Sequence, residues 1–227
     1  MNNDRYGNVI NHRTQSVIIE TNKVLKNTYL LLSLTLLFSA LTAAYSMMIN
    51  SPAINPILTF FVYMGLLFGI QATRNSPIAL VLTFTLTGFL GFTMGNILNY
   101  YIATFSNGAE MVMMSLGATG AIFLVLSIIA MSPGKDFSKL SSFLGVGSFI
   151  CLIAILLNLF LQIPAVHLAL SVMISFIAGG MILWQTNQII HGGEKNYITA
   201  TITLYVSMLN IFMTILQFCA MFAGRRD

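Results

Sequence analysis

Long apolar runs separated by short connectors make up most of this chain, and its few basic residues gather in every second connector. A helix that spans a lipid bilayer needs about 20 mostly apolar residues. Seven runs meet this requirement, at roughly 29–49, 53–73, 77–100, 109–131, 140–161, 164–189 and 197–222. The sequence therefore predicts an all-α polytopic membrane protein, with seven transmembrane helices in one bundle.

The composition agrees with a membrane protein and disagrees with a soluble one. Hydrophobic residues make up 57% of the 227 residues and charged residues only 7%, whereas soluble domains have about 25% charged residues. The net charge of +4 comes from basic residues beside the apolar runs, so it indicates no nucleic-acid partner. The first run is too long for the apolar part of a signal peptide and is expected to be an anchor.

The connectors are short and contain residues typical of turns, such as Asn50-Ser51-Pro52 and Ser132-Pro133-Gly134. Short connectors place consecutive helices side by side and antiparallel, which leaves no room for a separate soluble domain. Three segments are expected: a polar cytoplasmic tail at 1–28, the seven-span bundle at 29–222 and a short C-terminal tail at 223–227.

The distribution of basic residues predicts the orientation. Cytoplasmic connectors of membrane proteins carry an excess of Lys and Arg. Here the first, third and fifth connectors have none. The N-terminal segment has Arg5, Arg13, Lys23 and Lys26, and the second, fourth and sixth connectors have Arg74, Lys135, Lys139 and Lys195. The N-terminus is therefore predicted to be cytoplasmic, and seven spans place the C-terminus outside. Arg225 and Arg226 disagree with that, which leaves open a re-entrant run with a cytoplasmic C-terminus.

The last apolar run carries a polar stripe on one helical face. Its members recur at spacings of three or four residues: Asn196, Thr199, Thr203, Ser207, Asn210, Thr214 and Gln217. In lipid such side chains need protein or water partners. Hydrogen bonds between helices and a hydrated cavity both remain open as explanations, and either one predicts that the last helix is central in the bundle.

Small residues in the third run predict close helix packing. Gly91 and Gly95 form a G-x-x-x-G pair, and small residues of this kind let two helix backbones approach each other closely in a membrane.

No Asp or Glu lies in the middle of any apolar run. The six acidic residues are in tails, connectors or run ends: Asp4, Glu20, Glu110, Asp136, Glu194 and Asp227. Ion-coupled carriers use carboxylates within the membrane, and Ca²⁺ sites include carboxylate ligands. No metal site, cofactor or small-molecule substrate is therefore predicted. His167, near the outer end of the sixth run, is the titratable candidate beside a span, either as a structural histidine or as a proton relay.

An enzymatic reading fails on geometry. Ser148 and His167 could form a serine protease dyad only within hydrogen-bond reach of each other. They lie toward opposite faces of the membrane, and at 1.5 Å per residue their depths differ by more than about 10 Å. No phosphate-binding loop is visible, and we expect no enzyme.

Several stretches together resemble a known family. Residues 87–98 read TGFLGFTMGNIL, residues 158–171 read NLFLQIPAVHLALS and residues 189–198 read IIHGGEKNYI. From Thr21 onward the chain is similar to the Bax inhibitor-1 (transmembrane BAX inhibitor motif) family, and within it to the bacterial YccA branch of FtsH protease modulators. The resemblance implies a seven-span fold with the last helix wrapped by six others, in the bacterial inner membrane. In that membrane, the C-terminus that seven spans place outside would be periplasmic.

The resemblance also shows departures at functional positions. Calcium-leak members of the family have two aspartates on the sixth and seventh helices, which share a proton and gate the pore. The matching positions here are Gln185 and Ser207, which cannot ionise. Arg74 is the nearest match to an arginine that partners those acids. The resemblance thus implies that the salt-bridged latch of those members is replaced here by a neutral hydrogen bond between Gln185 and Ser207, which contributes about 1 kcal/mol. Gly95-Asn96 replaces a common Gly-Pro pair.

The resemblance supports two functional hypotheses of different classes. The first is a non-enzymatic inner-membrane protein that modulates or inhibits the membrane AAA+ protease FtsH, binding the protease complex through its spans and cytoplasmic tail. The alternative is a pH-insensitive cation (Ca²⁺) leak channel. A membrane scaffold with neither role is a third option, and the lipid bilayer is a partner in every case.

Overall fold

The computed structural model describes residues 3–132 and 134–223, which leaves Pro133, Arg225 and Arg226 outside the described residues. In this part of the chain there are seven helices, each with a segment long and apolar enough to cross a membrane, and no strands. They are α1 (Asn3–Met48), α2 (Pro56–Thr73), α3 (Pro77–Thr104), α4 (Gly108–Met131), α5 (Leu140–Leu161), α6 (Pro164–Ile190) and α7 (Tyr197–Phe222). The predicted all-α, seven-span fold is confirmed.

Proline and capping side chains set where several helices begin. Pro56, Pro77 and Pro164 each start a helix, where the missing N–H of proline costs nothing. The Asn55 side chain accepts a hydrogen bond from Ile57 N at 2.8 Å and so caps α2. The candidate membrane span within α1 is Thr21–Met48, and the helix itself begins earlier, at Asn3, within the segment assigned to a tail. The cytoplasmic position of that segment stays a prediction.

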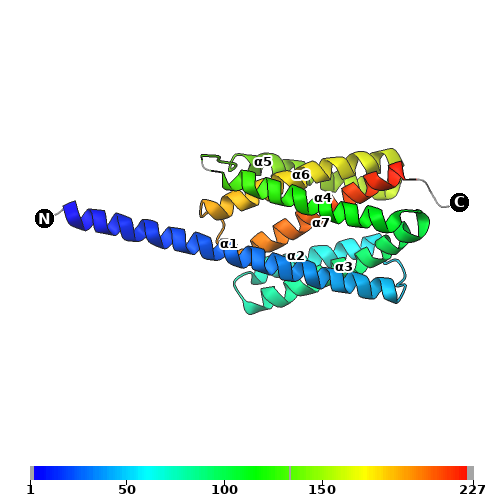
Figure 1. Ribbon diagram of the computed structural model, residues 1–227, viewed down its shortest axis with the longest axis horizontal. Coiled ribbons are helices and arrows are strands. Elements are labelled where there is room, and N and C mark those ends of the chain that lie inside the picture. Colours follow the sequence, from blue (N-terminus) through cyan, green and yellow to red (C-terminus); the bar gives the residue numbers. More distant parts are fainter. Residues whose placement is uncertain (1–2, 133, 224–227) are drawn as a thin grey trace.

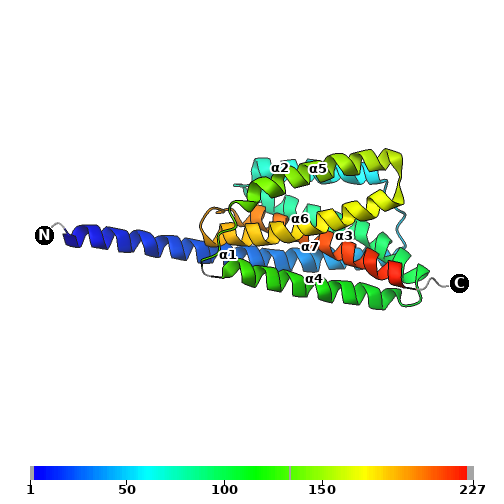
Figure 2. The same ribbon diagram turned by 90° about the horizontal axis from the view of Figure 1, so that it is seen from above.

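Five helices form the compact part of the bundle and two lie at its side. α1 packs along α3, α6 along α7, and α4 against both α6 and α7. α2 packs along α3, and α5 packs along α6; in the described part of the chain neither has another helix as a substantial neighbour. Figures 1 and 2 show α2 and α5 on the same side of the molecule but well separated from each other. The two peripheral helices are therefore attached to opposite halves of the bundle.

The last helix has four neighbours. Within the described residues α7 packs against α1, α3, α4 and α6, and α2 and α5 are absent from this set. The expectation of a central last helix wrapped by all six others is thus not confirmed. One side of α7 remains without a helix in front of it.

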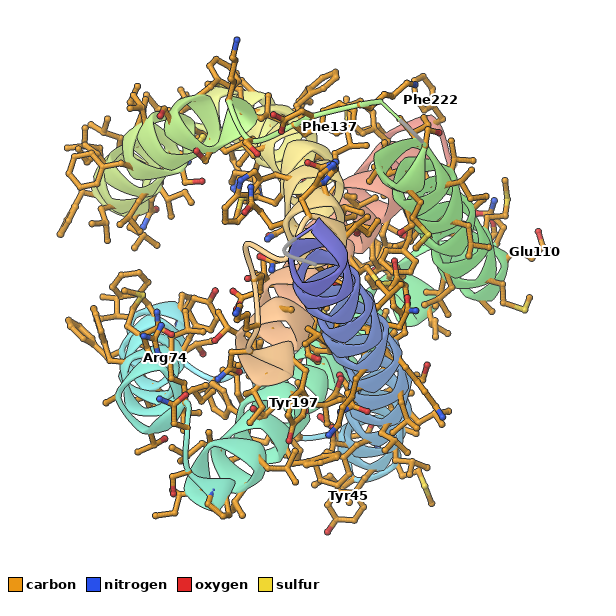
Figure 3. The ribbon with its side chains drawn as sticks, turned by 90° about the vertical axis from the view of Figure 1, so that its left-hand side faces the viewer. Tyr45, Arg74, Glu110, Phe137, Tyr197 and Phe222 are labelled. Carbon is orange, nitrogen blue, oxygen red and sulfur yellow. The ribbon has the colours of Figure 1, made fainter. Side chains whose placement is uncertain are left out.

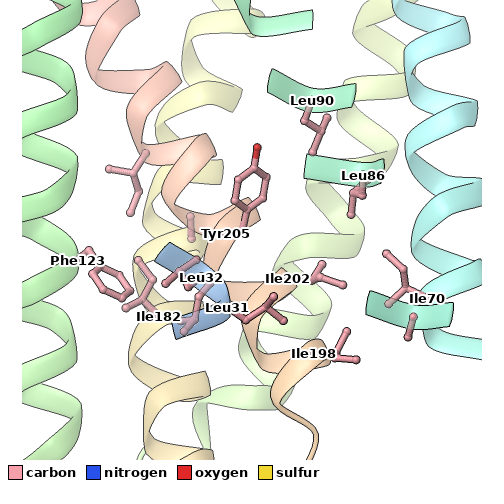
Figure 4. Close-up of a cluster of buried hydrophobic side chains, with 14 residues drawn as sticks. Leu31, Leu32, Ile70, Leu86, Leu90, Phe123, Ile182, Ile198, Ile202 and Tyr205 are labelled. Atoms are coloured by element: carbon pink, nitrogen blue, oxygen red, sulfur yellow. The ribbon is translucent and has the colours of Figure 1, made fainter. Parts of the chain in front are cut away.

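A hydrophobic cluster joins α1, α2, α3, α4, α6 and α7 near the middle of the bundle (Figure 4). Tyr205 of α7 is almost fully buried in it. Its hydroxyl lies 2.6 Å from Ser39 Oγ of α1 and donates to Thr87 O of α3 at 3.3 Å. The polar end of this aromatic side chain therefore connects three helices where lipid and water are both excluded.

The α1–α3 contact depends on two glycines. A Cβ added at Gly91 would overlap with the backbone oxygen of Ser39, and one added at Gly95 would overlap with that of Ala43. Both glycines are buried. The backbones of α1 and α3 approach each other more closely here than any larger residue would allow.

The basic connectors lie at one end of the bundle. Asn196 Nδ2, in the α6–α7 connector, donates to Arg74 O of the α2–α3 connector at 2.7 Å. Asn187 Nδ2, near the end of α6, donates to Lys135 O of the α4–α5 connector at 3.0 Å. Val24 of α1 packs at the same end, against Ile189 and Ala200 of α6 and α7. The C-terminal end of α7 lies at the opposite end (Figure 1).

Candidate functional site

The polar stripe of α7 begins with a cap that fixes the start of the helix. The Asn196 side-chain oxygen accepts hydrogen bonds from Ile198 N and Thr199 N, at 2.9 and 3.1 Å. Its amide nitrogen also donates to Arg74 O. Asn196 therefore holds α7 to the connector between α2 and α3, which is a structural role.

The middle of the stripe bonds to its own helix. Thr203 Oγ1, Ser207 Oγ and Asn210 Nδ2 donate to the carbonyl oxygens of Thr199, Thr203 and Val206, at 3.0, 2.7 and 2.9 Å. Hydroxyl side chains in helices often donate in this way to a carbonyl oxygen of the preceding turn. Among the described residues, none of these three side chains hydrogen-bonds to another helix. Hydrogen bonding between helices therefore does not explain the middle of the stripe.

The C-terminal end of the stripe contacts α6. Thr214 Oγ1 donates to Ser171 O at 3.0 Å, and Gln217 Nε2 lies 3.4 Å from His167 Nε2. Neutral imidazole can accept a hydrogen bond from an amide at one ring nitrogen. The structure thus brings together two residues that the sequence identified separately, His167 and Gln217.

A groove lies in front of the middle of the stripe. Its volume is about 580 Å³, and residues of α2, α3, α5, α6 and α7 line it. Thr203, Ser207 and Asn210 form part of its floor, while its walls are mostly apolar. Figure 3, seen along the helices, shows the opening between α2 and α5, with α6 and α7 at its inner end, toward the centre of the bundle. We call this space the α2–α5 groove.

Gln185 and Ser207, at the positions of the two acids of leak members, make no hydrogen bond to each other among the described residues. Gln185 is 1% exposed, and its Nε2 has no hydrogen-bond partner among the described residues. Ser207 bonds to Thr203 O and borders the α2–α5 groove. Among the described residues the neutral hydrogen bond implied for this pair is absent, although the Ser207 oxygen, whose proton is donated to Thr203 O, could still accept one. The side chain of Arg74 is exposed at the end of α2, and its role as a latch stays a prediction.

The acidic residues from Thr21 to Ala223 lie near the bundle ends. Glu110 is in the first turn of α4, and Asp136 and Glu194 are in connectors. The Ser138 hydroxyl and backbone N–H stabilise the ionised Asp136 carboxylate and lower its pKa. No group of three or more His, Cys, Asp or Glu side chains gathers in this part of the chain. The polar atoms that face the groove are thus uncharged.

Sequence reasoning did not identify Asn187. This residue is fully buried near the end of α6. It donates to Ala130 O and Lys135 O and accepts from Phe137 N, at 3.3, 3.0 and 3.0 Å. Asn187 belongs to the run Gln185-Thr186-Asn187-Gln188, which is unusually polar for the end of an apolar helix, and this polarity is the sequence feature that could have identified it.

Comparison with known proteins gives consistent similarities. The model of the family described as "Inhibitor of apoptosis-promoting Bax1" matches residues 21–224. The "Modulator of FtsH protease YccA" of Escherichia coli (strain K12) is 44% identical over 208 residues, which cover 92% of this chain and 94% of the relative. An uncharacterized protein of Pseudomonas aeruginosa is 43% identical over 90% of this chain and 92% of its own length. An uncharacterized membrane protein of Vibrio cholerae is 41% identical over 90% and 93%.

Proposed function

Because this chain belongs to the Bax inhibitor-1 family, we propose that it is a non-enzymatic, multi-pass inner-membrane protein that modulates the FtsH protease. The observation that carries the proposal is its 44% identity to the E. coli modulator of FtsH over nearly the full length of both chains. The lack of Asp and Glu in the middle of the described spans supports it further, since a carboxylate in the bilayer is the usual mark of an ion-coupled protein.

The proposed orientation places the basic end of the bundle in the cytoplasm. Arg74, Lys135 and Lys195 lie in connectors that hydrogen bonds and packing hold at that end. The positive-inside rule assigns an excess of basic residues to the cytoplasmic side. The start of α1 is then cytoplasmic as well, and the end of α7 is periplasmic.

This orientation supplies a mechanism for modulation. Helix contacts within the lipid dock the protein to the FtsH complex, and the cytoplasmic segment before Thr21 offers the protease a grip. The close α1–α3 contact at Gly91 and Gly95 and the bridge through Tyr205 resist extraction of α1 from the bundle. A substrate that is gripped but hard to unfold occupies the protease.

Affinity purification from native membranes tests the proposal. The tagged full-length chain is expected to retain FtsH on the resin after mild solubilisation. Membranes from cells that express the untagged chain at the same level are the control. Equal FtsH signals from the tagged and untagged samples would contradict the proposal.

Deleting residues 2–20 tests the grip. Because the protease would have no free segment to hold, we expect the shortened protein to be degraded more slowly in cells that contain FtsH. Turnover is followed after synthesis is stopped, and cells depleted of FtsH are the control. Unchanged turnover would remove the grip from the mechanism while leaving the binding proposal in place.

One observation favours a second candidate, a Ca²⁺ leak. Ser207, one of the two positions that carry acids in leak members, borders the α2–α5 groove. Liposomes that contain the purified protein would then release Ca²⁺, and these two positions would give the release rate no pH dependence, because neither Gln185 nor Ser207 ionises. Flux no greater than that of empty liposomes would exclude this candidate.

A further inference from the structure

We propose that the α2–α5 groove is the docking site for one transmembrane helix of the FtsH complex, a helix that carries small hydroxyl or amide side chains on its docking face. This inference rests on the proposed function for the identity of the partner. It adds the place of contact and the chemistry of the partner helix.

The groove is a gap in the ring of helices around α7. α7 has α1, α3, α4 and α6 as neighbours, and its remaining side opens between α2 and α5. These two helices are also the least buried of the seven. A helix placed between them would cover the free side of α7 and give α2 and α5 a second neighbour each.

The length of the groove suits a stretch of helix. On α2 its lining extends from Pro56 to Leu67, and on α7 from Ile202 to Asn210. At 1.5 Å per residue these stretches are about 17 and 12 Å long, which corresponds to two to three turns of a partner helix. The small side chains of Ser207 and Ala178 in the lining allow a second backbone to come close.

Polar atoms on three different helices distinguish a protein occupant from a lipid chain. The Asn210 amide uses one N–H on Val206 O, which leaves its oxygen and second N–H for an occupant. The hydroxyls of Thr59 on α2 and Ser148 on α5 also line the groove, and within the described part of the chain they make no hydrogen bond. Acyl chains have no donor or acceptor, whereas Ser, Thr, Asn and Gln on a helix satisfy such groups in the bilayer.

Site-specific photo-crosslinking in native membranes tests the location. A benzoylphenylalanine is placed at Leu152, which lines the groove, and in a second protein at Leu124, which is exposed on α4 at the other side of the bundle. Light is expected to join the Leu152 variant to a membrane subunit of the FtsH complex and to leave the Leu124 variant uncoupled from it. Adducts only with lipid, only with a second copy of the chain, or equally from both positions would overturn the proposal.

Filling the groove tests its importance for binding. Ser148→Trp is expected to lower the amount of FtsH that co-purifies by about fivefold, because the indole would occupy the space of the partner helix. Asn210→Leu is expected to lower it by about threefold, because a single interhelical hydrogen bond in a membrane contributes little. Val125→Trp, on the exposed side of α4, is the matched control and should retain FtsH. Full retention by a folded Ser148→Trp protein would contradict the proposal.

The two experiments separate this inference from the proposed function. If the unaltered chain fails to retain FtsH, the proposed function is wrong whatever the groove does. If it retains FtsH but neither the Leu152 crosslink nor the Ser148→Trp effect is seen, the docking site alone is wrong. Gel filtration of each variant in detergent checks folding, and the crosslink decides the question should Ser148→Trp fail to fold.

Discussion

Single polar residues carry most of the specific geometry of this bundle. Asn187 joins α6 to the α4–α5 connector through two hydrogen bonds and to the end of α4 through a third, and Tyr205 joins α7 to α1 and α3. Spacing along the sequence predicts that the polar residues of α7 share a face, because a helix has a fixed period. It does not predict their partners, since Thr203 and Ser207 can bond to their own helix as readily as to a neighbour.

Replacing Asn187 by Leu should destabilise the protein. The change leaves Lys135 O, Ala130 O and Phe137 N without their partner, and unmet buried polar groups cost about 1–3 kcal/mol each. We expect a lower midpoint of thermal unfolding in detergent and faster proteolysis of the α4–α5 connector. Gln188→Leu is the control, because Gln188 makes one hydrogen bond to the same connector from a more exposed position. Equal midpoints for both variants would contradict this role of Asn187.

At the scale of helices, the apolar runs predicted the elements closely and their packing poorly. The runs at 140–161 and 197–222 match α5 and α7, because hydrocarbon requires long helices and Pro, Asn and Gly mark their ends. Hydropathy treats α2 and α7 almost alike, yet α7 is among the most buried helices and α2 the least. In a membrane both lipid-facing and protein-facing surfaces are apolar, so the α2–α5 groove could not be predicted from the sequence.

The α1–α3 contact gives a prediction at this scale. Gly95→Val adds side-chain atoms where the backbone of α1 already lies, and overpacking of this kind typically costs about 1–3 kcal/mol. We expect Gly95→Val to lower the thermal midpoint in detergent. Gly117→Val on α4 is the control, since nothing lies within 4 Å of a Cβ built there. A similar loss in both variants would show that valine in a helix, rather than contact with α1, is responsible.

At the scale of the whole molecule, the separation of charge between the two ends predicts how the protein lies in the membrane. The connectors that contain Asn75 and Ser138 lie at the basic end, and Ala53 and Asn107 lie in connectors that have no basic residue. Because basic connectors remain in the cytoplasm, the first pair should be inside and the second pair outside.

Cysteine labelling tests this orientation directly. Single cysteines are introduced at Asn75, Ser138, Ala53 and Asn107 in a chain that carries Cys151→Ala and Cys219→Ala. A membrane-impermeant maleimide added to spheroplasts is expected to label the cysteines at Ala53 and Asn107, and to label the other two only after the inner membrane is opened. The opposite pattern would invert the orientation. A fifth cysteine at Ala223 should react from outside, because an odd number of spans separates it from the start of α1; labelling only from inside would mean that one of the seven helices does not cross the membrane.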